Sequence, residues 1–312
     1  MKKKICVLGM VFALASAVFA GCGEKDRSET NSQEQSSEQE VTSEQDYNEF
    51  MQELERINSV DSMINKYGYA SYTCKETLAD GSDFLYTIYK DENRDVYTDK
   101  YGVLIKENQD IYGNDEENDL YIRYLFIGDT YEEFRSFYFD VFIHEYSEKE
   151  EVTLKEVKDG MIYLETEIKD GIDKELLATY GFESENIEYI LTEYVIDEST
   201  LEIYEVKSYV VMGNQKNIFL SVKWEKECEE YILDEEIIEG VYGDDSRTLS
   251  VVVDEGTADE KVYTQTVTKG SAIIVMIPEE FEQKVYADPE CTEEAIVDKM
   301  NDQTLYLKRI EE

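Results

Sequence analysis

The side chains that could carry out chemistry in this chain are mostly carboxylates. Its 312 residues include 73 Asp and Glu but a single histidine, His144. A zinc site built from several imidazoles is therefore excluded, and no G-x-S-x-G, P-loop, H-E-x-x-H or C-x-x-C motif is present. His144 adjoins Glu145 in an aromatic stretch, which favours a structural role. No catalytic residue is predicted, and only a pair of carboxylates, as glycoside hydrolases use, could be hidden in this composition.

One cysteine has a context that predicts covalent modification. Three lysines at positions 2–4 precede an uncharged apolar stretch at 5–19, which is too short to span a bilayer comfortably and is typical of a signal peptide. Small residues then lead to Cys22. The tripeptide Ala20-Gly21-Cys22 resembles the lipobox of bacterial lipoproteins, although Phe19 stands where an aliphatic residue is usual. The resemblance implies cleavage between Gly21 and Cys22 and a diacylglycerol on the Cys22 thiol.

This interpretation places the protein outside the cytoplasm. Residues 1–21 are the expected lipoprotein signal peptide, and the membrane is the expected partner, reached through the lipid on Cys22. Two acyl chains hold a protein stably where one would be marginal. We therefore expect a lipid-anchored protein, modified with fatty acids such as palmitate, on the extracytoplasmic face of a bacterial cell membrane. The alternative is an ordinary signal peptide followed by a coincidental cysteine.

Charge and cysteine content exclude several classes of partner and site. The formal net charge of −43 repels phosphate backbones and excludes nucleic acid as a partner. Asp91-x-Asn93-x-Asp95 lacks the glycine and the twelfth-position glutamate of a calcium loop, and no metal site or cofactor is predicted. Besides Cys6 and Cys22, the chain has three cysteines: Cys74, Cys228 and Cys291. An odd number cannot pair completely, which suggests buried thiols rather than a disulfide framework.

Composition along the chain indicates two folded parts behind a tether. Residues 22–45 are Ser, Glu, Gln and other polar residues without an aromatic, so they cannot bury enough apolar surface to fold. The remainder is rich in tyrosine and β-branched residues, which favours sheet. We expect an antiparallel β domain with an N-terminal helix at 46–240 and a small β domain at 245–312, separated near 240–247.

Periodicity places the individual elements. Apolar residues at three- and four-residue steps predict a helix over 47–64 with a stop at Gly68, and Asp80-Gly81 predicts a hairpin between strands at 69–76 and 83–89. Residues 130–146 suit a helix or an aromatic strand, and we favour the helix. Residues 113–119 are expected to form a polar loop. Further strands are expected at 95–106, 120–127, 152–157, 161–168, 187–196, 201–212, 217–225, 247–254, 261–267 and 272–276, with a short helix at 173–180.

Two stretches resemble known families. The order of elements over 47–226, with Tyr194-Val195-Ile196-Asp197 before a long strand, resembles the LolA-like lipoprotein carriers. That resemblance implies a curved, open antiparallel half-barrel over helices, with an apolar cavity. Residues 247–308, with Tyr286-Ala287-Asp288 and Cys291-Thr292 before Thr304-Leu305-Tyr306, are similar to the InlB B-repeat-like β-grasp modules of surface proteins. The second resemblance implies a structural or interaction module.

Together these observations predict an α+β protein, mainly antiparallel β, with three candidate functions. The leading hypothesis is a non-catalytic binding protein, not an enzyme, whose larger domain holds an apolar or lipid-like ligand; its ligand-binding residues are unknown from sequence. The second is a surface interaction or envelope-structural protein with a protein ligand. The third is a carboxylate-based glycan hydrolase. Aromatic residues lining a groove would suit a sugar ring or an apolar ligand.

Overall fold

The computed structural model describes residues 44–140, 150–170, 172, 177–178, 180–182, 186–226 and 231–310. The chain divides into two compact units, and each is built from two separate stretches of sequence. The first unit takes residues 1–92 and 141–228, and the second takes 93–140 and 229–312. The predicted signal peptide and nearly all of the predicted tether lie outside the described residues.

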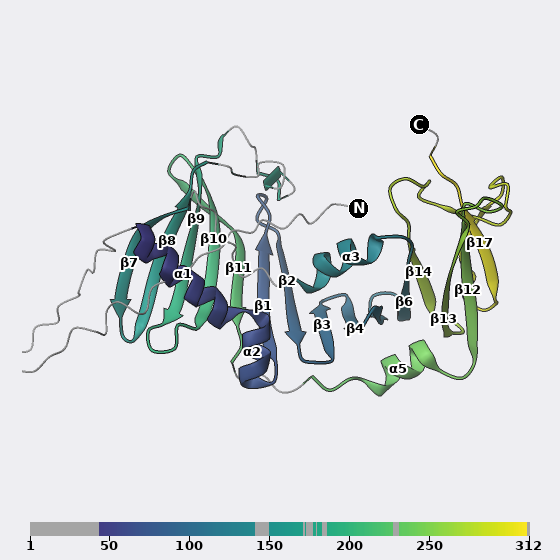
Figure 1. Cartoon of the computed structure of the whole chain (residues 1–312), viewed down its shortest axis with the longest axis horizontal. Coiled ribbons are helices and arrows are strands. Elements are labelled where there is room, and N and C mark those ends of the chain that lie inside the picture. The colour runs from purple at the N-terminus through teal and green to yellow at the C-terminus, as the bar shows by residue number, and fades with distance from the viewer. Residues whose placement is uncertain are drawn as a thin grey trace, which may run out of the picture. The chain divides into compact units, whose positions relative to one another are not determined.

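The first unit is an open antiparallel sheet covered by two helices (Figure 1). Its helices are α1 (Glu44–Asn58) and α2 (Val60–Tyr67). Its strands follow one another across the sheet with antiparallel neighbours throughout. In that order they are β2 (Asp83–Lys90), β1 (Ala70–Thr77), β11 (Gln215–Trp224), β10 (Ile203–Met212), β9 (Tyr189–Asp197), β8 (Met161–Ile168) and β7 (Glu150–Lys158).

The apolar face of α1 forms the core of this unit. Phe50, Met51 and Leu54 follow at helical spacing and pack on alternate residues of β8 and β9 and on two residues of β10 that flank a register shift. The predicted single helix over 47–64 is in fact two helices, broken at Ser59. The backbone of Ser59 is extended and its hydroxyl accepts from the Ser62 amide at 3.2 Å, so it caps α2 instead of continuing α1. The predicted stop at Gly68 is confirmed, with a φ of 83° at that residue.

A buried carboxylate ties α2 to the rest of the first unit. Glu202, at the end of the turn between β9 and β10, has a side chain that is only 2% exposed. It accepts hydrogen bonds from Lys66 Nζ and Tyr67 OH at the end of α2, and from Lys226 Nζ at 2.6 Å. Burial by itself would raise the pKa of Glu202, but these three donors outweigh it and lower the pKa from 4.5 to about 2.

The second unit joins an antiparallel meander to a smaller sheet. The meander is β3 (Arg94–Asp99), β4 (Gly102–Glu107), β5 (Asp110–Asp115) and β6 (Leu120–Phe126), and β14 (Ala272–Met276) adds to β6 in parallel. The smaller sheet has the order β13 (Lys261–Thr268), β12 (Ser246–Val253), β17 (Gln303–Leu307), β15 (Val285–Tyr286) and β16 (Glu294–Ala295). Its helices are α3 (Thr130–Phe139) and α5 (Glu235–Tyr242).

This division differs from the predicted boundaries, which placed 93–140 and 229–240 in the larger domain. Residues 93–140 belong with the C-terminal part because β14 pairs directly with β6. The predicted domain boundary near 240–247 begins in a closely packed stretch. A Cβ on Gly240 would lie 2.2 Å from the ring of Tyr121, and the Gly240 carbonyl accepts from Ser271 Oγ at 2.7 Å. Glycine permits this close approach, although the same residue type also marks domain boundaries in a sequence.

Two further details of the meander differ from the sequence-based expectation. The single strand expected at 95–106 is the pair β3 and β4, which turns at Lys100 and Tyr101. The loop expected from Gly113 onward begins inside β5, where Gly113 faces β4 so closely that a Cβ would lie 1.9 Å from the Val103 carbonyl oxygen. The helix favoured at 130–146 is confirmed over 130–139 as α3, and 141–149 lie outside the described residues.

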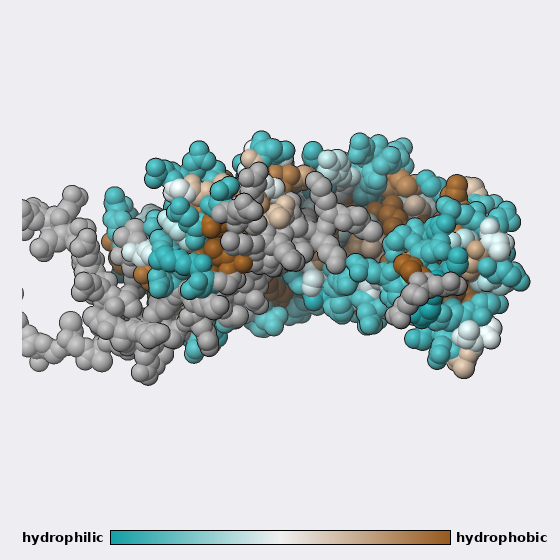
Figure 2. Space-filling view, turned by 90° about the horizontal axis from the view of Figure 1, so that it is seen from above, coloured by the Kyte–Doolittle hydropathy of each residue, from teal (hydrophilic) through white to brown (hydrophobic). Residues whose placement is uncertain are grey.

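The predicted fold class is confirmed. The protein is α+β, with two helices described in each unit and sheets that are mostly antiparallel and open. The short helix expected at 173–180 falls largely outside the described residues. The surface seen in Figure 2 is mainly hydrophilic, with apolar residues in separate patches, as the charged composition leads one to expect. Within the described residues, no helix combines the length and the apolar character needed to cross a bilayer.

Candidate binding groove

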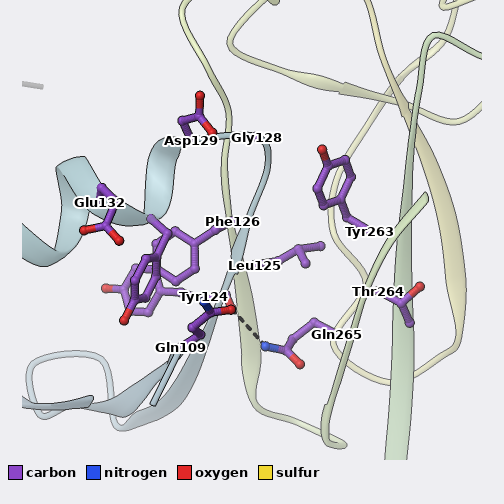
Figure 3. A pocket seen from close by; sticks show the side chains of 11 residues that line it. Gln109, Tyr124, Leu125, Phe126, Gly128, Asp129, Glu132, Tyr263, Thr264 and Gln265 are labelled. Atoms are coloured by element: carbon purple, nitrogen blue, oxygen red, sulfur yellow. Dashed lines mark hydrogen bonds between the residues drawn. The ribbon is translucent and has the colours of Figure 1, made fainter. Parts of the chain in front are cut away.

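A groove of about 450 Å³ opens in the second unit where β6 leads into α3, opposite the middle of β13 (Figure 3). One group of lining residues is aromatic or aliphatic: Tyr124, Leu125, Phe126, Tyr131 and Tyr263. The other group is polar, with one glycine: Gln109, Gly128, Asp129, Glu132, Thr264 and Gln265. The groove thus combines ring surfaces with a few polar groups, which is the usual make-up of a small-molecule site.

The aromatic wall follows from strand alternation. Tyr124 and Phe126 stand two residues apart in β6, so both side chains leave the same face of the strand. Their rings stack with centroids 6.0 Å apart, and Tyr131 of α3 meets Phe126 edge-on at 5.3 Å. The Tyr131 hydroxyl donates to the Asn108 carbonyl at 2.8 Å, which holds that ring in place. Burial raises the pKa of Tyr124, so its hydroxyl remains protonated at physiological pH.

The facing wall is supplied by β13. Tyr263 lies across the opening from the aromatic wall, and Gln265 closes the lower end (Figure 3). The Gln265 side-chain amide donates to the Tyr124 carbonyl at 3.0 Å. That carbonyl lies just beyond the last β5–β6 register pair, Tyr112 with Arg123. The glutamine therefore satisfies a backbone group of β6 beyond its pairing with β5, and it fixes the base of the groove.

A network beside the groove holds its two walls together. Arg123 donates to Asp110 through Nε at 3.1 Å and through Nη2 at 2.5 Å, and its Nη1 donates to the Thr266 carbonyl at 2.6 Å. Tyr242 of α5 donates to the same Asp110 carboxylate at 2.7 Å. Burial, followed by this bond to Asp110, raises the pKa of Tyr242. These bonds link β5, β6, α5 and β13, so the groove is preformed rather than assembled by a ligand.

The groove is negatively charged. Asp129 precedes α3 at the cap position but makes no side-chain capping bond, and its carboxylate has no hydrogen-bond partner among the described residues. Glu132 accepts from Arg135 Nε at 2.8 Å. Among the described residues that line the groove, none is a lysine, arginine or histidine. Both carboxylates come from one short stretch and so share one wall, whereas glycoside hydrolysis needs carboxyl groups on either side of the scissile bond.

The residues singled out by sequence lie elsewhere. Gly21, Cys22, His144 and Cys228 are outside the described residues, so lipid attachment stays a prediction. Cys74 is buried in β1, as expected for a small apolar residue, and Cys291 is a partly buried thiol in a turn. Within the described residues no cluster of three or more His, Cys, Asp or Glu side chains could hold a metal ion.

The described core beneath α2 leaves almost no space for a ligand. Between Met63, Tyr72 and Trp224 the free volume is about 10 Å³, roughly one water molecule or less. The ligand cavity that the first resemblance implied for the larger domain is not found at that position. The groove lies in the second unit, with one wall from the predicted larger domain and the other from the predicted small domain, and it was missed because 263–265 and 124–132 are distant in sequence. Its only local signal was the aromatic alternation of 124 and 126 before an acidic helix start.

Comparisons with known proteins give no family. No family model matches the chain, and no curated protein does. Among solved structures, an uncharacterised conserved protein from Thermus thermophilus covers 62% of this chain and 94% of its own, with 7% identity and a TM-score of 0.31. A LolA superfamily protein from Nitrosomonas europaea covers 57% of this chain and 96% of its own, with 10% identity and a TM-score of 0.22. At these scores the likeness carries no argument about function.

The second of these structures bears the family name that the sequence suggested for 47–226. The similarity of 247–308 to InlB B-repeat-like modules stays a prediction.

Proposed function

We propose that this protein is a lipid-anchored binding protein on the extracytoplasmic face of a bacterial membrane, and that its ligand occupies the groove of the second unit. The anchoring half of the proposal rests on the sequence of residues 1–22 and its lipobox-like end at Cys22. The binding half rests on one observation, the preformed groove between β6, α3 and β13.

The groove supports binding rather than catalysis. Its volume of about 450 Å³ is within the range of small-molecule sites, roughly 300–1,000 Å³. The partly exposed rings of Phe126, Tyr131 and Tyr263 offer surface to an apolar or lipid-like part of a ligand, with the buried Tyr124 behind them, while Asp129 and Gln265 offer polar contacts. The two carboxylates share a wall, which does not suit an acid and a nucleophile acting from opposite sides.

The anchoring half is tested by mass spectrometry of the protein isolated from its own membrane. We expect the wild-type chain to begin at Cys22 and to carry the mass of a diacylglycerol on the thiol. Cys22→Ala should remain an uncleaved precursor or be released in soluble form. An unmodified Cys22 in the wild type would refute lipid anchoring.

The binding half is tested by native mass spectrometry of the full chain in mild detergent, with extraction of bound small molecules. Tyr263→Ala removes the ring that faces the aromatic wall, and Tyr163→Ala is the control because Tyr163 is an exposed tyrosine of β8 in the first unit. We expect a co-purifying ligand in the wild type and in Tyr163→Ala but not in Tyr263→Ala. Absence of ligand from the wild type, or equal retention by both variants, would contradict a binding site in the groove.

A protein-interaction function is favoured by a different observation. Four aliphatic side chains of the second unit are largely exposed, with fractions of 88%, 57%, 55% and 54% for Ile296, Val262, Ile310 and Met300. Protein contacts are marked by exposed apolar side chains that form one contiguous patch, so this function requires that these side chains meet a single partner surface. Cross-linking in intact cells from cysteines placed at 296 and 300 tests this function, and the absence of any cross-linked protein would count against it.

A further inference from the structure

We propose that the groove of the second unit recognises an organic cation, an alkylated ammonium group held against the tyrosine and phenylalanine rings with Asp129 as its counter-charge. The inference rests on the proposed function, because it names the chemical class of ligand for the same groove. Three properties of the groove support it: the sign of its charge, the kind of surface it offers and its size.

Charge complementarity excludes anions and disfavours neutral ligands. The described lining contains two carboxylates and no cationic side chain, and the chain as a whole carries a net charge of −43. Glu132 is already bonded to Arg135, whereas Asp129 has no hydrogen-bond partner in the described part of the chain. Asp129 is exposed at the rim, and a neutral ligand would gain nothing from its charge. A cation compensates the carboxylate, and the field of the acidic protein draws it in.

The ring surfaces supply the second half of the recognition. The π faces of Tyr and Phe attract cations through their quadrupole, and several rings around an alkylated ammonium group are a known use of this attraction. Here Phe126 and Tyr131 meet at an interplanar angle of 86°, so the aromatic wall presents rings in two orientations. Tyr263 faces that wall from β13, and Asp129 lies at the upper rim on the side of α3 (Figure 3). The methyl groups of such a ligand would also bury apolar surface against the rings.

The groove is larger than a bare ammonium group needs. At about 450 Å³, with exposed polar residues at its rim, it has room for the body to which the cationic group is attached. The proposed ligand is therefore a cationic head on a larger molecule, and a small head-group analogue is the appropriate probe.

The experiment compares choline with its neutral isostere 3,3-dimethylbutan-1-ol, in which carbon replaces the charged nitrogen. Both are titrated into the full chain in a non-ionic polyoxyethylene detergent and followed by NMR line broadening of the probe. We expect choline to bind about tenfold more tightly than the isostere, because only choline has cation–π and carboxylate attraction. Raising the salt from about 50 mM to about 500 mM should weaken choline binding and leave the isostere unchanged.

Matched variants separate the charge from the fold. Asp129→Asn keeps a residue that suits a helix cap and removes the charge, so we expect about fivefold weaker choline binding and unchanged binding of the isostere. Glu133→Gln is the control, since Glu133 is exposed on the same helix but does not line the groove. Equal losses in the two variants would show a general field effect and overturn the role assigned to Asp129.

The outcomes distinguish this inference from the proposed function. Equal affinities for choline and its isostere would overturn the assignment of a cationic ligand and leave groove binding intact. Salt-independent binding of a neutral sugar such as methyl glucoside, without binding of choline, would lead to the same conclusion. A co-purifying ligand that depends on Tyr263 but carries no positive charge would do the same. If no ligand depends on Tyr263, the proposed function itself fails.

Discussion

The sharpest test of the structure is the substitution Glu202→Gln. The Glu202 side chain is 2% exposed and accepts hydrogen bonds from Lys66, Tyr67 and Lys226. Because Glu202 directly precedes β10, these bonds hold α2 against the start of that strand. Glutamine has nearly the same shape, yet it has no charge and its amide group would face ammonium donors. The variant therefore removes the electrostatic part of this contact with little change in packing.

The magnitude follows from the pKa of the carboxylate. The hydrogen bonds outweigh burial and hold the pKa of Glu202 at about 2, against an ordinary value of 4.5. Since each pKa unit corresponds to about 1.4 kcal/mol, the folded structure favours the charged form by about 3 kcal/mol. The Lys66 side chain is 52% exposed, and water screens part of its attraction. We therefore expect Glu202→Gln to lower the free energy of unfolding of the first unit by about 2 kcal/mol at neutral pH.

The pH dependence provides an independent check of the cause. A carboxylate whose pKa is lowered by folding stabilises fully above its unfolded pKa, and this contribution is lost as the pH falls through the folded value. For Glu202 the window runs from 4.5 down to about 2. The difference between wild type and Glu202→Gln should therefore be largest at neutral pH and shrink through this window. Many other carboxylates titrate here too, and subtraction of the variant isolates Glu202.

The chain contains its own probe for this measurement. Trp224 is the single tryptophan, and its ring lies 5.2 Å from that of Tyr67, so its fluorescence reports on this part of the first unit. Urea unfolding followed at Trp224 gives the free energies, with Glu198→Gln as the control because Glu198 is exposed in the same turn. A loss below about 0.5 kcal/mol, the range of an ordinary surface change, would refute the reasoning. So would a difference that stays constant in acid.

Three further predictions concern the second unit. Gly113→Ala should lower its melting temperature measured by calorimetry, because the new Cβ would meet the Val103 carbonyl oxygen at 1.9 Å. Tyr242→Phe should destabilise by about 1 kcal/mol through the lost hydrogen bond to Asp110, seen as a smaller shift in the same scan. A chain ending at residue 240 should keep the Trp224 unfolding transition and lose the near-ultraviolet tyrosine signal of the second unit, because β14 no longer pairs with β6. Retention of that signal would support the boundary expected from sequence.

Local elements could be predicted from the sequence because their causes are local. The apolar steps of Phe50 and Leu54 and the left-handed stop at Gly68 depend only on neighbouring residues, and the structure confirms both. The break at Ser59 was missed, since a serine inside a helical pattern is visible as a cap only when its hydroxyl is seen to accept the Ser62 amide. The fold class followed from composition and strand alternation, which need no long-range information.

The division into units depends on long-range pairing, which a single sequence does not reveal. Residues 93–140 look like a continuation of the preceding strands, because consecutive strands are usually neighbours. The parallel pairing of Ile274 with Tyr124 joins segments 150 residues apart, and no local sequence pattern predicts this pairing. Gly240 illustrates the difficulty, since the same residue type marks a flexible linker in one setting and a close contact with an aromatic ring in another.

The groove follows from that same pairing. Once β14 occupies one edge of β6, the backbone of Tyr124 to Phe126 is bounded on that side, and β13 lies over the other end through Gln265. The aromatic side chains of β6 pack against Phe134 of α3, and Tyr124 is buried, so it is the partly exposed ring of Phe126 that remains available to a ligand. In a simple hairpin these side chains would only fill the core. Here they form the wall of a site, because β13 and β14, which follow the first unit in the sequence, return to lie beside β6. The candidate site is thus a consequence of topology: one wall, at 109–132, lies in the domain to which the sequence assigned the ligand, and the other, at 263–265, lies in the predicted small domain.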